Sequence, residues 1–153
     1  MDLRNFGEDC LIARLLRKHP VGRHLRLGPG DDCAVVARPE ETVLTLLKSD
    51  AVVERVHFDP EEDFRRVGWK ALARAVSDIA AMGGEPEQAL VTVVLPPALP
   101  VRKAEALYAG IYRCARRFGI GIAGGETSRS PDAADGSPGP VVVSVSLTGR
   151  VEK

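Results

Sequence analysis

Acidic residues stand beside glycine or serine at four separate places along the chain. These four segments cover residues 28–32, 48–50, 77–84 and 124–127. Carboxylates that converge repel one another unless a cation lies between them, and glycine lets the backbone come close to a ligand. Oxygen donors of this kind are typical ligands of Mg2+. If the four segments meet in space, the sequence predicts a magnesium site that holds a polyphosphate.

Two of the segments place their acids next to predicted strands. Asp31 and Asp32 come just before an apolar segment, and neighbouring residues of an extended chain point to opposite sides. At most one of these two acids is therefore expected to face a ligand, unless both belong to a solvated turn. Asp50 is predicted to end a strand directly after Ser49, where loops begin and ligands bind. The alternative for Asp50 is a helix cap or a turn.

The other two segments follow apolar runs. Asp78 lies in the most apolar helical stretch, where an unpaired buried charge is costly. It is therefore expected to bind a metal ion or to form an ion pair with Arg74. The glycines at 124–125 let backbone N–H groups reach phosphate oxygens, and the carboxylate of Glu126 can hold the magnesium of that phosphate. A tight turn is the alternative, because the ending of a Walker A loop is absent.

The composition argues against several classes of protein. The chain has 153 residues, with 21 basic and 21 acidic side chains, so bulk charge does not hold it to nucleic acid. The three histidines lack paired metal spacing, and the three cysteines form neither a disulfide framework nor a zinc motif. The first residues lack the apolar stretch of a signal peptide, and no run is long enough to span a membrane. A cytoplasmic protein with no nucleic-acid or membrane partner is expected.

Hydrophobic periodicity predicts the elements that must position these residues. Helices are expected over residues 8–18, 64–82 and 101–118, and strands over residues 33–37, 42–48, 89–95, 120–123 and 141–148. The strand over 141–148 has the clearest alternation. Residues 128–140 are polar and are predicted to form a mobile loop.

This order of elements predicts an α+β domain, in which a mixed sheet is covered on one face by two long helices. Residues 43–47 and 90–95 are apolar on both sides of their strands. The second face of the sheet therefore also needs cover, and we expect a partner chain or a further domain to bury it.

Taken together, the four segments resemble thiamine-monophosphate kinase, a family in the superfamily of aminoimidazole ribonucleotide synthetase. The motifs are Gly-Pro-Gly-Asp-Asp-Cys-Ala-Val-Val from 28, Ser-Asp from 49 with Glu-Arg-Val-His-Phe from 54, Ser-Asp-Ile-Ala-Ala-Met-Gly from 77 and Gly-Gly-Glu-Thr-Ser-Arg from 124. The resemblance runs from Gly7 to Val151. The stretch at 77–83 is shared across much of the superfamily, whereas 50–58 is more particular to the thiamine-phosphate enzymes.

The resemblance implies transfer of a phosphoryl group from ATP to thiamine phosphate with Mg2+, giving thiamine diphosphate. It implies a homodimer, in which the sheets of two chains pair into a barrel. The implied magnesium ligands are Asp32, Ser49, Asp50, Asp78 and Glu126. His57 is the implied substrate contact, and Tyr108, Gly125 and Glu126 are the implied nucleotide contacts. The implied mechanism is positioning and charge neutralisation, without a catalytic side chain.

The chain departs from the family at several positions. Lys48 stands where the family tends to have a small hydroxyl residue, so its charge replaces one cation or removes an ion site. Glu126 is one methylene longer than the usual aspartate, and Arg55 replaces a glycine expected after Glu54. Residues 1–153 are expected to form a single N-terminal ATP-binding-type domain, with the family's C-terminal domain absent. Two alternatives stay open: a kinase or synthetase of the same superfamily with another acceptor, and a non-catalytic nucleotide-binding or assembly module.

Overall fold

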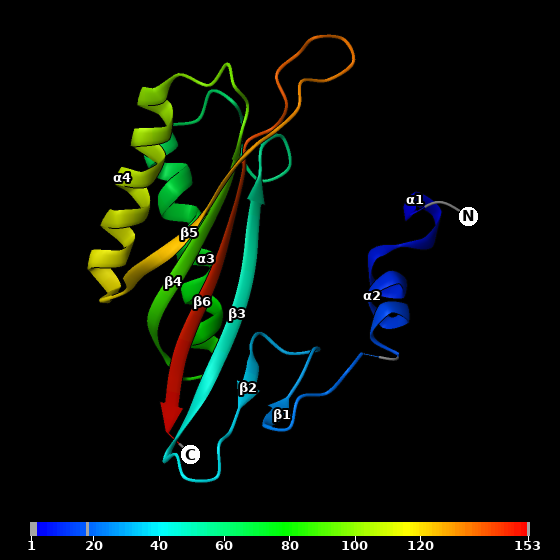
Figure 1. Ribbon diagram of the computed structural model, residues 1–153, viewed down its shortest axis with the longest axis vertical. Helices are drawn as coiled ribbons and strands as arrows, with labels where there is room; N and C mark the ends of the chain where they lie inside the picture. The colour runs from blue at the N-terminus through cyan, green and yellow to red at the C-terminus, as the bar shows by residue number, and fades with distance from the viewer. Residues whose placement is uncertain (1–2, 18, 153) are drawn as a thin grey trace.

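A six-stranded sheet forms the centre of the computed structural model, which describes residues 3–17 and 19–152 (Figure 1). The strands are β1 (Leu25–Leu27), β2 (Ala34–Val36), β3 (Val43–Val53), β4 (Glu85–Leu95), β5 (Gly121–Arg129) and β6 (Val142–Glu152). Their order in the sheet is β1-β2-β3-β6-β4-β5. Neighbours pair antiparallel, except that β4 and β5 run parallel. The sheet is therefore mixed, as the sequence predicted.

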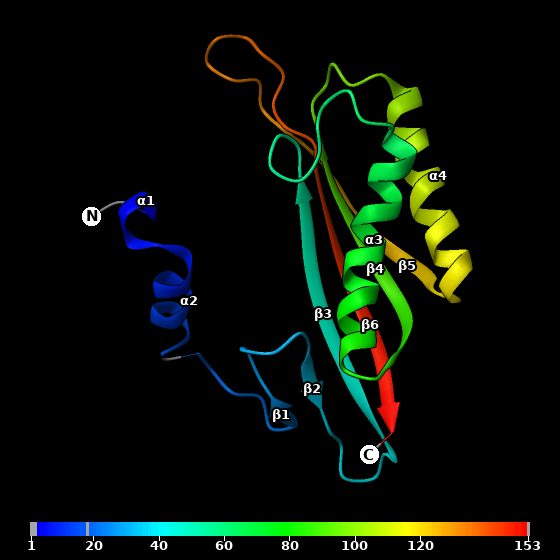
Figure 2. The same ribbon diagram turned by 180° about the vertical axis from the view of Figure 1, so that it is seen from behind.

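Two long helices, α3 (Phe64–Ala81) and α4 (Val101–Phe118), lie on the same face of this sheet (Figure 2). Asp63 caps α3 by accepting a hydrogen bond from the backbone N–H of Arg65 at 2.9 Å. Gly119 ends α4 with a left-handed φ of 68°. The prediction of one face covered by two long helices is confirmed, and the predicted bounds of α4 are correct.

The helices and the sheet share one apolar core. On β6, Val143, Val145 and Leu147 are at most 1% exposed, so the alternation read from the sequence is confirmed. The two helices come close at Gly68 of α3, where a Cβ would lie 1.9 Å from the carbonyl oxygen of Leu107 in α4. Only glycine fits at this crossing. Gly68 therefore lets α4 pack directly against the backbone of α3.

The N-terminal segment stands apart from this core in both views (Figures 1 and 2). It contains α1 (Leu3–Phe6) and α2 (Glu8–Leu16), and α2 has no buried residue. The predicted helix over 8–18 is thus confirmed as far as Leu16, and Lys18 lies outside the described residues. No helix within the described ranges has both the length and the apolar character needed to cross a membrane.

The four strands β3, β4, β5 and β6 are longer than the sequence predicted, and β1 was not predicted. β3 continues through its polar middle to Val53, because β6 pairs with it residue for residue from Val43 onwards. β4 begins at Glu85, and β5 runs on to Arg129 through the paired glycines. Inter-strand hydrogen bonds outweigh local polarity in these stretches. β1 has only three residues, too few for a periodic signal.

Candidate functional site

Lys48 and Asp50 lie in the middle of β3 and face α3. Leu46 and Val52, at the alternating positions on either side, are 0% and 1% exposed and belong to the core between sheet and helix. Side chains alternate along a strand, so Lys48 and Asp50 share that face. The prediction that Asp50 ends a strand is wrong, because β3 runs on to Val53.

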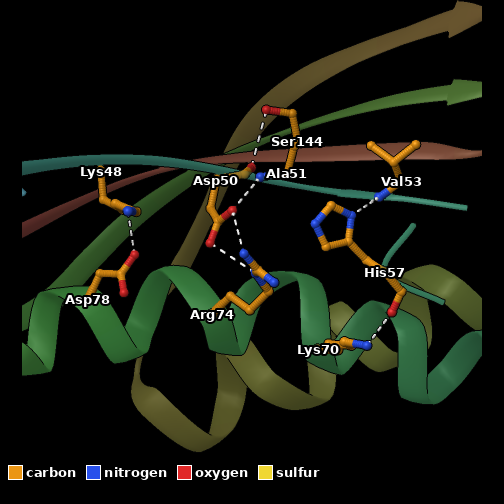
Figure 3. A network of polar contacts seen from close by, with 9 residues as sticks. All are labelled: Lys48, Asp50, Ala51, Val53, His57, Lys70, Arg74, Asp78 and Ser144. Carbon is orange, nitrogen blue, oxygen red and sulfur yellow. Dashed lines mark hydrogen bonds and ion pairs between the residues drawn. The ribbon is translucent and has the colours of Figure 1, made fainter. Parts of the chain in front are cut away.

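Asp50 is held by Arg74 of α3 (Figure 3). Arg74 Nε donates to Oδ2 at 3.0 Å and Nη2 donates to Oδ1 at 3.3 Å. The backbone N–H of Ala51 donates to Oδ1 at 2.7 Å, and Ser144 Oγ donates to the carbonyl of Asp50 at 3.3 Å. This two-pronged pairing fixes the plane of the carboxylate. Both carboxylate oxygens thus already have partners within the chain.

Asp78 lies one turn further along α3 and pairs with Lys48, whose Nζ contacts Oδ2 (Figure 3). Only 20% of the Lys48 side chain and 24% of the Asp78 side chain are exposed. The expected alternative, an ion pair between Arg74 and Asp78, is wrong. Helical side chains lean toward the N-terminus of their helix, so Arg74 reaches Asp50 instead. We call Lys48, Asp50, Arg74 and Asp78 the β3–α3 cluster.

The electrostatics of the cluster keep Lys48 charged. Partial burial alone would lower the pKa of Lys48, but the hydrogen bond from Lys48 to Asp78 and the charges of Asp78 and Asp50 outweigh burial. They raise the pKa above its ordinary value of 10.5. The cluster therefore contains two carboxylates and two cations and is neutral as a whole.

Asp32 belongs to the electrostatic surroundings of the cluster without touching it. The linking residue is Cys33, which is 2% exposed. Burial raises the pKa of the Cys33 thiol; the charge of Lys48 opposes this effect, and the charges of Asp78, Asp32 and Asp31 add to it. Asp31 and Asp32 are both exposed, and the backbone N–H of Asp32 donates to Asp31 Oδ1 at 2.8 Å.

His57 lies in the turn after β3 (Figure 3). The backbone N–H of Val53 donates to His57 Nδ1 at 3.0 Å, so the proton of the neutral ring is on Nε2. Lys70 of α3 donates to the backbone carbonyl of His57. Arg55 has a φ of 65°, a left-handed conformation that is uncommon outside glycine. This is the position where the resemblance leads one to expect glycine.

Two predicted ligands lie away from the cluster. Ser49 is adjacent to Asp50 in β3 and so points to the opposite, open face of the sheet. Glu126 lies in β5, in register with Thr92 of β4. Because β6 and β4 stand between β3 and β5, the backbones of Asp50 and Glu126 are about 14 Å apart at the usual strand spacing.

The other two predicted nucleotide contacts also lie away from the cluster. Gly125 does not lie in a loop, because it is part of β5 and pairs with Val91 of β4. A Cβ at Gly125 would lie 1.7 Å from the carbonyl oxygen of Val91, so only glycine fits this strand pairing. Tyr108 lies on α4, half-buried, with its ring centroid 5.7 Å from that of Tyr112. Burial raises its pKa, and the charge of Tyr112 adds to the rise.

The cluster has the donor chemistry for magnesium but not its charge balance. Asp50 and Asp78 offer the hard oxygen donors that Mg2+ prefers. Their charges are already neutralised by Arg74 and Lys48. Across residues 3–17 and 19–152, no three His, Cys, Asp or Glu side chains are grouped so that they could hold a metal ion. A divalent ion at this place must displace a cation of the chain.

The sequence contained no indication of Lys70, and it suggested the wrong partner for Arg74. Arg74 orients Asp50, and Lys70 holds the turn of His57. Lys70 looks like an ordinary solvated residue of a helix, and only the packing of α3 against β3 gives Lys70 and Arg74 these partners. The unusual Lys48 and the apolar surroundings of Asp78 were the signals in the sequence that pointed toward the pair these two residues form.

Residues 30–151 match the family described as AIR synthase related protein, N-terminal domain. A thiamine-monophosphate kinase of Rhodopirellula baltica is 34% identical over 153 residues, which cover 95% of this chain and 46% of that protein. The thiamine-monophosphate kinase of Aquifex aeolicus is 32% identical over 152 residues, which cover 99% of this chain and 44% of that protein. The chain thus spans less than half the length of these relatives.

Among solved structures, AaThiL complexed with AMPPCP and TMP superposes with a TM-score of 0.82 at 32% identity. The superposition covers 100% of this chain and 45% of the other chain. It confirms the α+β fold that the sequence predicted. With four fifths of its residues matching the family, the chain belongs to the AIR synthase related proteins and corresponds to their N-terminal domain.

Proposed function

We propose that this domain holds ATP and Mg2+ for the transfer of a phosphoryl group to thiamine phosphate, which yields thiamine diphosphate. One observation carries the proposal: the whole chain is similar to AaThiL, whose structure is complexed with AMPPCP and TMP. The relatives named thiamine-monophosphate kinase support the same substrate.

Asp50 is the proposed magnesium ligand of the β3–α3 cluster, and Asp78, which pairs with Lys48, and Asp32 are further carboxylates of the proposed site. Magnesium, when bound, supplies positive charge against the phosphates of ATP. The chain contributes orientation: the backbone N–H of Ala51 donates to Asp50 Oδ1 and would keep holding the carboxylate after a metal ion displaces Arg74. A carboxylate that is already oriented needs little reorganisation when the ligand arrives.

His57 is the proposed contact to the acceptor. Its ring is oriented by Val53, and its backbone by Lys70, so Nε2 is held in a defined direction. Ser49, Tyr108, Gly125 and Glu126 stay predictions from the resemblance, because their strands and helix put them away from the β3–α3 cluster.

The test measures ADP formation from ATP and Mg2+ with a panel of acceptors. We expect ADP release that requires thiamine phosphate and is accompanied by thiamine diphosphate. Release with a different acceptor, and none with thiamine phosphate, favours another reaction of the same superfamily. If Asp78→Asn leaves the release of ADP with thiamine phosphate unchanged, this result contradicts the proposed site.

A second candidate is a nucleotide-binding module without turnover. The observation that favours it is the neutral β3–α3 cluster, in which both carboxylates already have cationic partners. Such a module binds Mg-AMPPCP in calorimetry but forms no ADP with any acceptor. Thiamine diphosphate formation excludes it.

The open face of the sheet is proposed as the contact between two copies of the chain. Leu47 is 42% exposed and Leu90 is 50% exposed on this face, and both line an open groove of about 540 Å3. Apolar side chains gathered on one sheet face are typical of a buried contact. We expect a dimer in sedimentation at micromolar concentration and a monomer after Leu90→Asp. Val101→Asp, at a 73% exposed position on α4, is the control and should leave the dimer intact.

A further inference from the structure

Lys48 lies where a divalent ion would neutralise Asp78. Resting on the proposed function, we propose that Lys48 is an internal cation that substitutes for one divalent ion in the β3–α3 cluster. The domain then binds its nucleotide with one metal ion fewer than it would with a neutral residue at position 48. Lys48 is thereby a positioning residue for the phosphates.

The contact between Lys48 and Asp78 is enclosed rather than superficial. Nζ of Lys48 touches Oδ2 of Asp78, and about a fifth to a quarter of each side chain is exposed. The backbone of Lys48 is fixed by pairing with Leu147 of β6 in the middle of the sheet. An ammonium held there repels a second cation, because Coulomb forces are strong in partly desolvated surroundings.

The other half of the cluster differs in a way that matters for metal binding. The Arg74 side chain is 42% exposed, whereas that of Lys48 is 20% exposed. Arg74 can move its guanidinium into solvent and leave Asp50 to a metal ion. Lys48 rises from a central strand, and moving it away requires a larger rearrangement. Asp50 is therefore the carboxylate that binds a divalent ion, and Asp78 is the carboxylate whose charge Lys48 neutralises.

The chemistry of an ammonium suits this role. Lys48 has three N–H donors, and Asp78 is its ion-pair partner among the described residues, so the ammonium can also donate to phosphate oxygens. Unlike a divalent ion, this cation cannot dissociate from the chain.

The test titrates the protein with Mn2+ alone and counts bound ions by electron paramagnetic resonance. We expect Lys48→Met to bind one additional Mn2+, or to bind Mn2+ about tenfold more tightly, than the unaltered protein. Lys48→Arg keeps the charge and should behave like the unaltered protein. Lys48→Gln repeats the test with a polar side chain, in case the methionine disturbs folding. Lys103→Met removes an ammonium from α4 and is the matched control.

The location of the added ion is tested by Lys48→Met combined with Asp78→Asn, which should lose the gain. An equal Mn2+ count at equal affinity in Lys48→Met, Lys48→Gln and the unaltered protein overturns the inference, and so does a gain in Lys48→Arg. A parallel titration with Mg-AMPPCP separates this result from the proposed function. If the protein binds the nucleotide but Lys48→Met gains no Mn2+, only the proposed role of Lys48 is wrong. A gain of Mn2+ without nucleotide binding supports the internal cation and counts against the proposed function.

Discussion

The pair formed by Lys48 and Asp78 is expected to stabilise the fold by a measurable amount. Exposed ion pairs contribute about 0.2–1 kcal/mol, and breaking a buried pair costs about 3–5 kcal/mol. With 20% and 24% of the two side chains exposed, this pair lies between these limits. We expect Asp78→Asn to lower the free energy of unfolding by about 2 kcal/mol, because it leaves a partly buried ammonium without its partner.

The assay is a double-mutant cycle in urea, with Lys48→Met, Asp78→Asn and the double variant at neutral pH. The coupling energy is expected near 1.5 kcal/mol, and the double variant should be more stable than Asp78→Asn alone. The exposed pair of Arg150 and Glu85, at 3.0 Å, is the control and should give less than about 1 kcal/mol. A coupling energy below about 0.3 kcal/mol for Lys48 and Asp78 refutes the enclosed ion pair.

Three further predictions concern single positions. Arg55→Gly should raise the free energy of unfolding by up to about 1 kcal/mol, because φ at this residue is 65°; a loss of stability in thermal unfolding contradicts this. Gly125→Ala should lower the free energy of unfolding by at least about 2 kcal/mol, because its Cβ would meet the Val91 carbonyl. Gly22→Ala, with open space around it, should lower it by less than about 1 kcal/mol, and equal losses count against the strand pairing. The pKa of Lys48 is raised in the folded protein, so the stability that its charge contributes is fully present below pH 10.5 and is lost as the pH rises through the folded pKa. In urea unfolding up to about pH 11.5, the unaltered protein should therefore lose more stability than Lys48→Met.

Much of the fold could be predicted from the sequence, because two helices and the last strand have strong periodic patterns. The alternation of Val143, Val145 and Leu147 identified a half-buried strand, and the stop at Gly119 identified the end of α4. The lengths of β3 and β5 could not be predicted. Polar and glycine residues within them read as loops, and they stay in strands only because neighbouring strands pair with them.

The candidate site could be predicted in part. Asp50 and Asp78 were identified from their context, and the structure places them on facing elements within one cluster. Their partners could not be assigned, because Arg74 lies one helical turn from Asp78 in sequence and yet reaches Asp50 across the helix–sheet boundary. Glu126 illustrates the limit: its position in the sheet depends on strand order, which no local pattern encodes.

Binding of Mg-AMPPCP, measured by calorimetry with two matched charge-removing variants, tests the central claim most directly. Asp50 is held in the β3–α3 cluster, whereas Asp31 is exposed and does not belong to it. We predict saturable binding to the unaltered protein, a loss of at least about tenfold in Asp50→Asn, and a change of less than about twofold in Asp31→Asn. No binding to the unaltered protein, or equal losses in the two variants, contradicts the claim that the β3–α3 cluster holds the nucleotide's metal.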